Sequence, residues 1–209
     1  MKAYIEKKTG IHIGFSGIDG SGKSTQAMLL CKWLKDLGVN AIFYEEKRNF
    51  VSEISDTIAR KNGFPSGRTY LGEPLYMMCI SFEVLKQNML NIRPYTQTGQ
   101  TIVSSRTIFD WIAGAMTRKC RQPEFNHAKE IIMSCGIPDI TIWLDTSPPI
   151  AHQRVENRRF DKAKLNYLIK CRQVFKMLFK EYPHHRICGD KDINSVHKTI
   201  IKIIEKYLK

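Results

Sequence analysis

Short apolar runs alternate along the chain with longer segments in which apolar residues recur at helical spacing. The strand-length runs lie at 11–16, 39–44, 100–105, 139–145 and 185–188. Strands that alternate with helices predict an α/β fold, a parallel sheet with helices on both of its faces. No internal repeat and no low-complexity linker interrupts the pattern, so we expect a single domain over 1–209.

The segments between these runs have the spacing of amphipathic helices. The expected helices cover 25–34, about 50–61, 73–92, 107–118, 125–135 and about 193–208. Gly38 fits the cap that ends the first helix, and the sequence GFPSG at 63–67 predicts a loop. The last helix closes the sheet with the apolar residues of one side, which are Val196, Ile200, Ile203, Ile204 and Leu208.

A glycine-rich stretch joins the first strand to the first helix. Residues 17–25 read GIDGSGKST and fit G-x-x-x-x-G-K-[ST], the phosphate-binding P-loop, in the strand–loop–helix context that this motif requires. Glycines let successive backbone N–H groups turn toward phosphate oxygens, and the helix N-terminus adds partial positive charge. The expected phosphate-binding residues are Gly17, Gly20, Ser21, Gly22, Lys23, Ser24 and Thr25.

Two of these side chains have distinct chemical roles. Lys23 is a mobile cation that reaches the outer phosphates, and Ser24 offers a hydroxyl to Mg²⁺. The alternative is a chance glycine loop before an ordinary helix. The complete motif and both of its flanks argue against that alternative.

Composition places the chain among globular proteins. Its 209 residues suffice for a sizeable core, 43% of them are hydrophobic, and no apolar run approaches the length of a membrane span. The first eight residues, MKAYIEKK, have no apolar signal core. Six scattered cysteines form no C-x-x-C pair, which argues against a zinc or redox site. We expect them to be reduced and largely buried in a cytoplasmic protein.

The formal net charge is +13, which suits nucleic acid, an anionic membrane surface or phosphorylated small molecules as partners. The lysines are spread along the chain without a dense basic block. A solvated basic surface is therefore favoured over a nucleic-acid site. A site for nucleotides would also account for some of the arginines.

Taken in order, the motifs resemble the thymidylate kinase branch of P-loop nucleoside monophosphate kinases, nearly from end to end. The resemblance rests on 15–26, on Arg106 after the third strand, on 138–145, and on Arg154 with the basic stretch at 158–161. It implies a P-loop NTPase three-layer sandwich whose five-stranded parallel sheet has the order 2-3-1-4-5. It also implies nucleotide substrates, ATP with Mg²⁺, commonly a homodimer, and transfer of the ATP γ-phosphate to a nucleoside monophosphate, with dTMP first.

The resemblance also assigns a short lid around 154–161. Gly20 stands where the family has either arginine or glycine, and the glycine type resembles enzymes whose lid supplies the catalytic arginines. Arg158 and Arg159 would close on the phosphates, and Arg154 would lie near adenine and ribose. A guanidinium keeps its proton and neutralises charge on the transferred group. The alternative is a solvated basic helix end.

On the acceptor side, the resemblance assigns Asp19, Glu46 and Arg106. Asp19 is expected to serve catalysis as well, together with Lys23 and the lid arginines. Arg106 would contact the acceptor phosphate, because open α/β sheets bind ligands just outside the carboxyl ends of their strands. A surface ion pair is the alternative for Arg106. Lys47 replaces the proline that follows the acid in the family.

Departures from the family pattern gather on the acceptor side. Ser105 replaces the acid of the family's D-R-Y, and Asp110 is a candidate substitute for it. The alignment puts Met78 and Phe82 where the family holds the thymine ring, and phenylalanine cannot donate a hydrogen bond to that ring. Gly114 replaces a tyrosine beside the acceptor and widens the expected pocket.

These departures leave the acceptor open. A shifted or broadened acceptor and an ordinary thymidylate kinase with a misaligned helix 73–92 are equally supported. The further alternatives are a kinase for a different small molecule, a nucleotide-binding regulator without turnover, and a basic nucleic-acid-binding protein that uses ATP. The base pocket predicts broad or shifted acceptor use in which Arg106 is still required.

Overall fold

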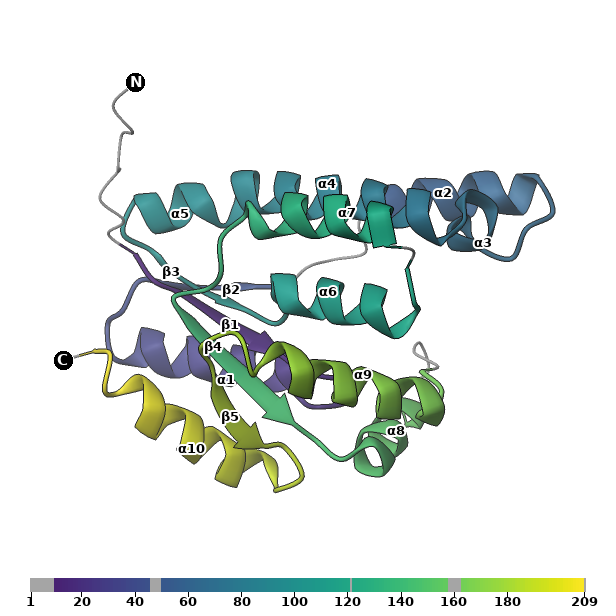
Figure 1. Ribbon diagram of the computed structural model, residues 1–209. Coiled ribbons are helices and arrows are strands. Elements are labelled where there is room, and N and C mark those ends of the chain that lie inside the picture. Colours follow the sequence, from purple (N-terminus) through teal and green to yellow (C-terminus); the bar gives the residue numbers. More distant parts are fainter. Residues whose placement is uncertain (1–9, 46–49, 121, 158–162, 209) are drawn as a thin grey trace.

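The computed structural model describes residues 10–45, 50–120, 122–157 and 163–208. They form a parallel sheet with helices on both sides (Figure 1). The strands are β1 (His12–Ser16), β2 (Ala41–Tyr44), β3 (Thr101–Ser104), β4 (Ile140–Asp145) and β5 (His185–Cys188). The helices are α1 (Lys23–Asp36), α2 (Phe50–Lys61), α3 (Gly67–Leu71), α4 (Glu73–Asn91), α5 (Arg93–Gln97), α6 (Ile108–Thr117), α7 (Gln122–Met133), α8 (Pro148–Glu156), α9 (Leu165–Leu178) and α10 (Ile193–Ile204).

The strand order is β2-β3-β1-β4-β5, and every pairing is parallel, which confirms the predicted fold and order. In the central strand β1, Gly14 lies opposite Ser104 of β3 and Thr141 of β4. Because parallel strands end at the same edge of a sheet, the loops that follow β1 and β3 meet there.

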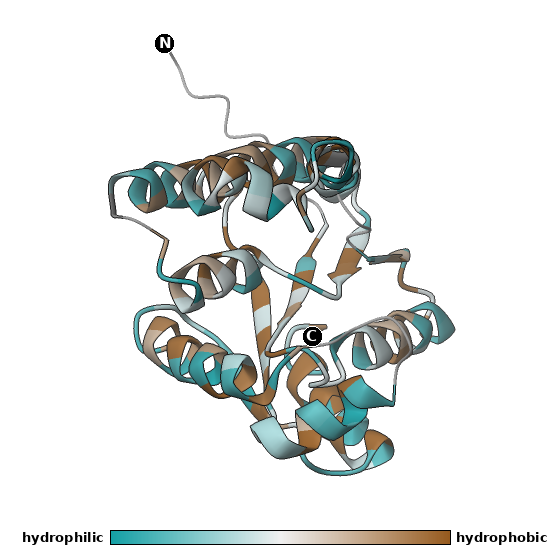
Figure 2. Ribbon diagram, turned by 90° about the vertical axis from the view of Figure 1, so that its right-hand side faces the viewer, coloured by the Kyte–Doolittle hydropathy of each residue, from teal (hydrophilic) through white to brown (hydrophobic). Residues whose placement is uncertain are grey.

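Two hydrophobic clusters hold the helices to the sheet. One joins α1 and α10 to side chains such as Phe15 and Ile142. The other joins α4, α6, α7 and α9, and Trp143 of β4 belongs to it. In Figure 2 the strands are mostly hydrophobic, whereas the helices carry both hydrophobic and hydrophilic residues. Burial of each large side chain stabilises the fold by about 1.5–3 kcal/mol, so the strands are fixed from both faces.

Gly14 allows α6 to begin against the middle of β1. A Cβ atom at this position would lie 2.5 Å from Thr107 Cγ2 and 2.8 Å from Pro138 Cγ. Only glycine therefore lets Thr107, the residue that caps α6, pack directly on the strand that leads into the glycine loop.

The first helix ends as expected. Gly38 follows it with φ of +80°, and the N–H of Val39 donates to Leu34 O at 3.0 Å, the geometry of a glycine C-cap. The last helix was expected to reach Leu208 but ends at Ile204, because Leu208 is exposed and adds nothing to the core.

Some local expectations were wrong. The loop expected at 63–67 is cut short, because the Ser66 side chain accepts a hydrogen bond from the N–H of Thr69 and α3 begins at Gly67. Helices α3, α5, α8 and α9 were not expected. All six cysteines are free, but only Cys31 and Cys171 are buried, so the expectation of largely buried thiols was wrong. Within the described ranges, no helix has the length and apolar character needed to cross a membrane.

Candidate active site

The glycine loop between β1 and α1 has a backbone that side chains disfavour. Gly17, Gly20 and Gly22 have φ of +149°, +83° and +96°. A Cβ atom at Gly20 would lie 2.2 Å from Ala151 O, so α8 packs directly on the loop. Gly22 caps α1 without a side-chain hydrogen bond, and the first N–H groups of the helix face the loop as an anion-binding end.

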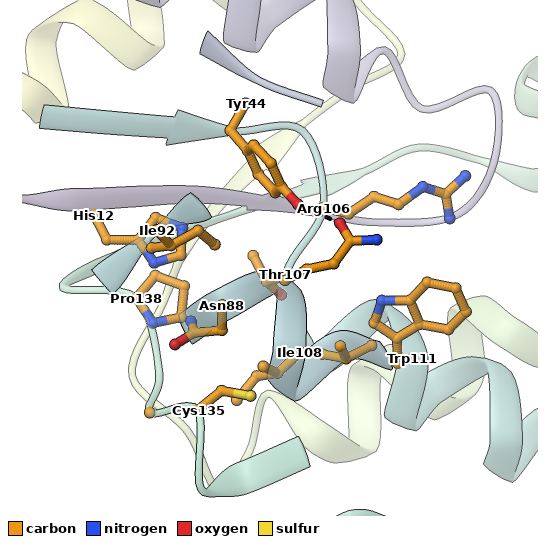
Figure 3. A pocket seen from close by; sticks show the side chains of 13 residues that line it. His12, Tyr44, Asn88, Ile92, Arg106, Thr107, Ile108, Trp111, Cys135 and Pro138 are labelled. Atoms are coloured by element: carbon orange, nitrogen blue, oxygen red, sulfur yellow. Dashed lines mark hydrogen bonds between the residues drawn. The ribbon is translucent and has the colours of Figure 1, made fainter. Parts of the chain in front are cut away.

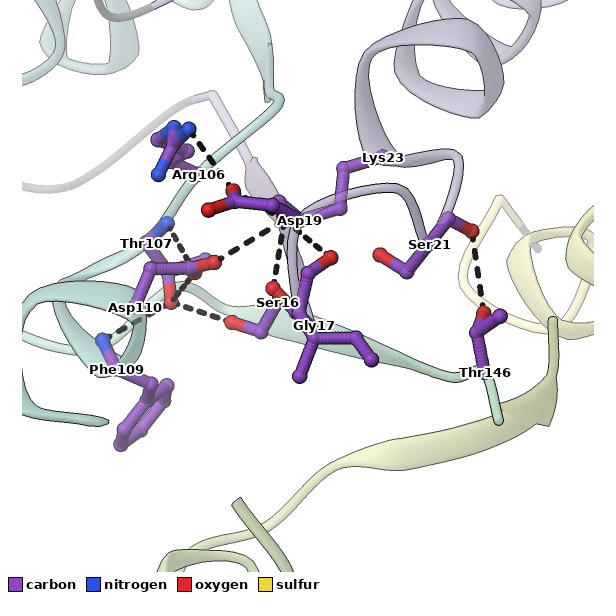
Figure 4. A network of polar contacts seen from close by, with 11 residues as sticks. Ser16, Gly17, Asp19, Ser21, Lys23, Arg106, Thr107, Phe109, Asp110 and Thr146 are labelled. Atoms are coloured by element: carbon purple, nitrogen blue, oxygen red, sulfur yellow. Dashed lines mark hydrogen bonds and ion pairs between the residues drawn. The ribbon is translucent and has the colours of Figure 1, made fainter. Parts of the chain in front are cut away.

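Lys23 bends back over the loop and is only 7% exposed. Its Nζ donates to Gly17 O at 2.6 Å and to Ile18 O at 3.0 Å. The same nitrogen lies 3.7 Å from Asp110 Oδ1 and 4.0 Å from Asp19 Oδ1 (Figure 4). The ammonium is therefore held between two carboxylates at the end of β1.

The start of α6 carries Asp110 to this lysine. Thr107 and Asp110 form a capping box, in which the N–H of Thr107 donates to Asp110 Oδ2 at 3.0 Å and Thr107 Oγ1 accepts from the N–H of Phe109 at 3.1 Å. Thr107 Oγ1 also lies 2.6 Å from Ser16 Oγ at the end of β1. The T-x-x-D spacing is a capping signal that sequence reasoning could have used.

Asp110 is 5% exposed, and its Oδ1 accepts no hydrogen bond from the described residues. Burial raises the pKa of Asp110, and the nearby charges of Lys23 and Arg106 offset this only in part. Asp110 was assigned to the acceptor, but its carboxylate faces Lys23. Ser105, which stands where the family has an acid, is itself buried beside the site.

Asp19 and Arg106 form the second charged pair of the site. Arg106 follows β3, and its Nη2 donates to Asp19 Oδ1 at 3.3 Å (Figure 4). Burial alone would raise the pKa of Asp19, but the charges of Lys23, Arg106 and Arg118 outweigh it and hold this pKa below its usual value. The structure thus brings together residues that were predicted from separate motifs.

A pocket opens beside Arg106, between the sheet, helices α4 and α6 and the segment that joins α7 to β4 (Figure 3). Its lining includes Tyr44, Gln87 and Trp111, and the Tyr44 hydroxyl donates to Gln87 Oε1. These residues carried no signal in the sequence, because they belong to three elements far apart in the chain.

The two residues predicted to contact the base, Met78 and Phe82, lie on α4, and their contact with the acceptor stays a prediction. Phe82 is 57% exposed, and neither Phe82 nor Met78 is among the described residues that line the pocket beside Arg106. Met78 packs against the cluster of α4, α6, α7 and α9. Gly114 is buried in α6, next to Arg118 and Tyr167. Glu46 lies outside the described residues.

Arg154 of α8 contacts the glycine loop at Gly20 and the loop after β5 at Gly189. Its Nη1 donates to Gly189 O at 3.0 Å and approaches Gly20 O at 3.5 Å. It lines a second pocket together with Gly22, Thr25 and the loop after β5. Ser24 lies in the first turn of α1, half-buried. The lid arginines, Arg158 and Arg159, lie outside the described residues.

Asp145 fixes the strands and the loop that lie next to the second pocket. Its carboxylate accepts from Arg172 Nε at 2.6 Å and from Arg186 Nε at 2.9 Å, which ties β4 to α9 and β5. Burial would raise the pKa of Asp145, but these hydrogen bonds outweigh it and the pKa is lowered. The N–H of Gly189 donates to Asp145 O at 3.1 Å, so the loop that contacts Arg154 is fixed to the end of β4.

Comparison with known proteins agrees with this geometry. The family model described as thymidylate kinase matches residues 15–200. A thymidylate kinase of Thermoanaerobacter sp. (strain X514) is 27% identical over 95% of this chain and 99% of its own length. Thymidylate kinases of Caldanaerobacter subterraneus subsp. tengcongensis and of Leptospira interrogans are each 28% identical, over 96% and 95% of this chain and 97% and 96% of their own lengths. The chain belongs to the thymidylate kinase family.

Proposed function

We propose that the protein transfers the γ-phosphate of ATP to dTMP, which gives dTDP and ADP. The observation that carries the proposal is the convergence at Asp19 of two cations from different motifs. Lys23 of the glycine loop lies 4.0 Å from this carboxylate, and Arg106 after β3 donates to it at 3.3 Å. A cation for the donor phosphates and a cation for the acceptor phosphate therefore meet at one point. The names of the relatives support dTMP as the acceptor.

In this mechanism the protein positions the two phosphates and neutralises charge, and no covalent intermediate on the protein is needed. The loop glycines and the start of α1 bind the donor phosphates. Lys23 leaves its contacts with the carbonyls of Gly17 and Ile18 and pairs with phosphate oxygens instead. Asp19 orients Arg106 toward the acceptor phosphate. Arg158 and Arg159 close on the transferred group.

Two side chains suit Mg²⁺, which prefers oxygen ligands and is commonly held by few protein groups together with substrate phosphates. Asp110 Oδ1 is buried, accepts no hydrogen bond from the described residues and lies 3.7 Å from Lys23 Nζ, so this oxygen has a lone pair left for a second cation. Ser24 supplies a hydroxyl in the first turn of α1. When bound, Mg²⁺ would neutralise charge on the donor phosphates. Asp110 and Ser24 would hold it directly or through water.

Arg154 would contact adenine or ribose in this proposal. It lines the pocket formed by the glycine loop and the segment after β5, and Arg106 is not among the described residues that line this pocket. This arrangement supports a donor nucleoside on one side and an acceptor on the other. The proposal also includes a single domain over residues 1–209 with a short lid around 154–161.

Turnover with a panel of acceptors tests the proposal. ADP formation is measured with dTMP, dUMP, other nucleoside monophosphates and non-nucleotide phosphates at one ATP concentration. We expect turnover with dTMP, and we expect Lys23→Met to lower it by about 10²–10³-fold or more, because a charge that stabilises the transition state is lost. Lys32→Met is the matched control, since Lys32 is exposed on the same helix.

The outcomes separate the alternatives. ATP binding without turnover of any acceptor would overturn the proposal and favour a regulator. Strong preference for another acceptor would favour the shifted specificity that Gly114 suggested. An exclusive preference for dTMP would refute a broadened acceptor.

The proposal includes a homodimer in the cytoplasm. Leu75, Phe82 and Met89 are exposed on α4 at intervals of seven residues, which puts them on one side of the helix. A second copy of the chain would cover this apolar stripe. The mass of the protein in solution measures the oligomer. Six free thiols suit a reducing compartment.

A further inference from the structure

Arg118 lies just beyond the end of α6, and contacts from two helices hold its guanidinium. Its Nη1 donates to Gly114 O at 3.0 Å, one turn back along α6. Its Cζ lies 4.8 Å from the centroid of the Tyr167 ring in α9, a cation–π distance. Arg118 is exposed as a residue, but its guanidinium is held against the Tyr167 ring and the Gly114 carbonyl.

Gly114 provides the space that the guanidinium occupies. A Cβ atom at Gly114 would lie 2.9 Å from Arg118 Nη1 and 3.7 Å from the Tyr167 hydroxyl. Glycine disfavours a helix interior, so local helix stability does not explain its presence in α6. Any side chain at this position would displace Arg118 from its contact with the backbone.

The guanidinium belongs to the acceptor side of the site. The charge of Arg118 acts on Asp19 along with the charges of Lys23 and Arg106. The charge of Asp19 in turn acts on Tyr167. Gly114 lies one helical turn beyond Asp110 on α6, so the guanidinium held at Gly114 O lies on the side of α6 that carries Asp110 to Lys23.

We infer that Arg118 is a specificity-determining residue that binds an oxygen atom of the acceptor, either of its phosphate or of its nucleoside. This rests on the proposed function. Arginine has five N–H donors in a fixed plane, and one of them is engaged by Gly114 O. Stacking on Tyr167 fixes the orientation of that plane before the acceptor arrives. A ligand oxygen on the Asp19 side then meets a preorganised donor.

Four variants test the inference. Arg118→Gln removes the charge and the stacking. Gly114→Ala leaves Arg118 in the sequence but displaces its guanidinium, which is the far end of a flexible side chain and can move without loss of the fold. Arg118→Lys keeps the charge but loses the planar fork. Lys119→Gln removes the neighbouring exposed charge and serves as the control.

The measurements are KM for dTMP, KM for ATP, kcat and the melting temperature. We expect Arg118→Gln to raise KM for dTMP by about ten- to a hundredfold, the usual effect of one lost charge-assisted hydrogen bond. KM for ATP should stay within about twofold. Gly114→Ala should change KM for dTMP in the same direction with an unchanged or higher melting temperature, because alanine favours helix. The KM of Arg118→Lys for dTMP should lie between the values of Arg118→Gln and the wild type.

Inhibition by thymidine, which lacks the phosphate, identifies which acceptor oxygen Arg118 binds. Weaker inhibition of the Arg118→Gln variant indicates a nucleoside oxygen, and unchanged inhibition indicates the phosphate. An unchanged KM for dTMP in both Arg118→Gln and Gly114→Ala would overturn the inference, and Arg118 would then serve only the end of α6. That failure is distinct from failure of the proposed function, in which the wild type itself turns over no dTMP.

Discussion

Replacing Asp110 by asparagine separates the chemical role of this carboxylate from its structural one. Asparagine keeps the size of the side chain and an oxygen that can accept from the N–H of Thr107, so the cap of α6 survives. The change removes the negative charge that lies 3.7 Å from Lys23 Nζ. The variant therefore tests whether the carboxylate serves the lysine and the phosphates.

The structure sets the expected magnitude. At 3.7 Å and an effective dielectric constant of about 20, the attraction between Asp110 and Lys23 is about 4.5 kcal/mol. Burial nevertheless raises the pKa of Asp110, so removal from water costs the charged form more than its partners return. Asp110→Asn should then unfold at the wild-type temperature or above it. Its kcat should fall by about 10²-fold, because Lys23 loses the group that positions it.

The pH dependence of stability gives a second test of whether the charge of Asp110 destabilises the fold. The pKa of Asp110 is higher in the folded protein than in the unfolded chain, so the folded wild type binds the proton more tightly. Wild-type stability relative to Asp110→Asn therefore rises as the pH falls through the folded pKa. The difference in melting temperature between variant and wild type should shrink on acidification.

Kinetics with saturating ATP and dTMP, together with thermal unfolding at several pH values, measure both effects. A variant with wild-type kcat would refute the role of Asp110 at the phosphates. A variant that melts well below the wild type, with a difference that does not change with pH, would show that the ion pair with Lys23 stabilises the fold.

Two further predictions follow from the glycine loop and the lid. Gly20→Ala should lower stability and ATP affinity together, because its Cβ would lie 2.2 Å from Ala151 O at a φ of +83°. Thermal unfolding and ATP titration measure these two effects. An unchanged melting temperature and an unchanged ATP affinity would contradict the close packing of α8 on the loop. Arg158→Ala and Arg159→Ala should each lower kcat by on the order of 10³-fold with a smaller effect on KM for ATP, because in the proposed mechanism their charges act on the transition state. Single variants with unchanged kcat would remove the lid from the mechanism.

Local features could be read from the sequence because they depend on neighbouring residues. The glycine loop needs a strand, three positive φ values and a helix in succession, and residues 12–36 contain all of these. The glycine cap after α1 and the five strands follow from similarly local patterns. The strand order came from the resemblance to a known family, and the pairings confirm it.

Contacts between elements were decided by the tertiary structure. Asp110 reaches Lys23 only because Gly14 lets the cap of α6 pack on β1. No pattern in the sequence of β1 or of α6 predicts that these two segments pack together. The pairing of Arg118 with Tyr167 likewise depends on how α6 and α9 lie together.

The rotation of α4 about its axis is the reason why acceptor residues on this helix are hard to predict from the sequence. One residue of misalignment along a helix turns a side chain by about 100° around its axis. Position 82 was matched to a base contact, which stays a prediction, and Phe82 is 57% exposed, while Tyr76, Ile80 and Val84 of the same helix are buried. Spacing along α4 establishes that the helix is amphipathic, but its rotation is set by packing against α7 and the neighbouring helices.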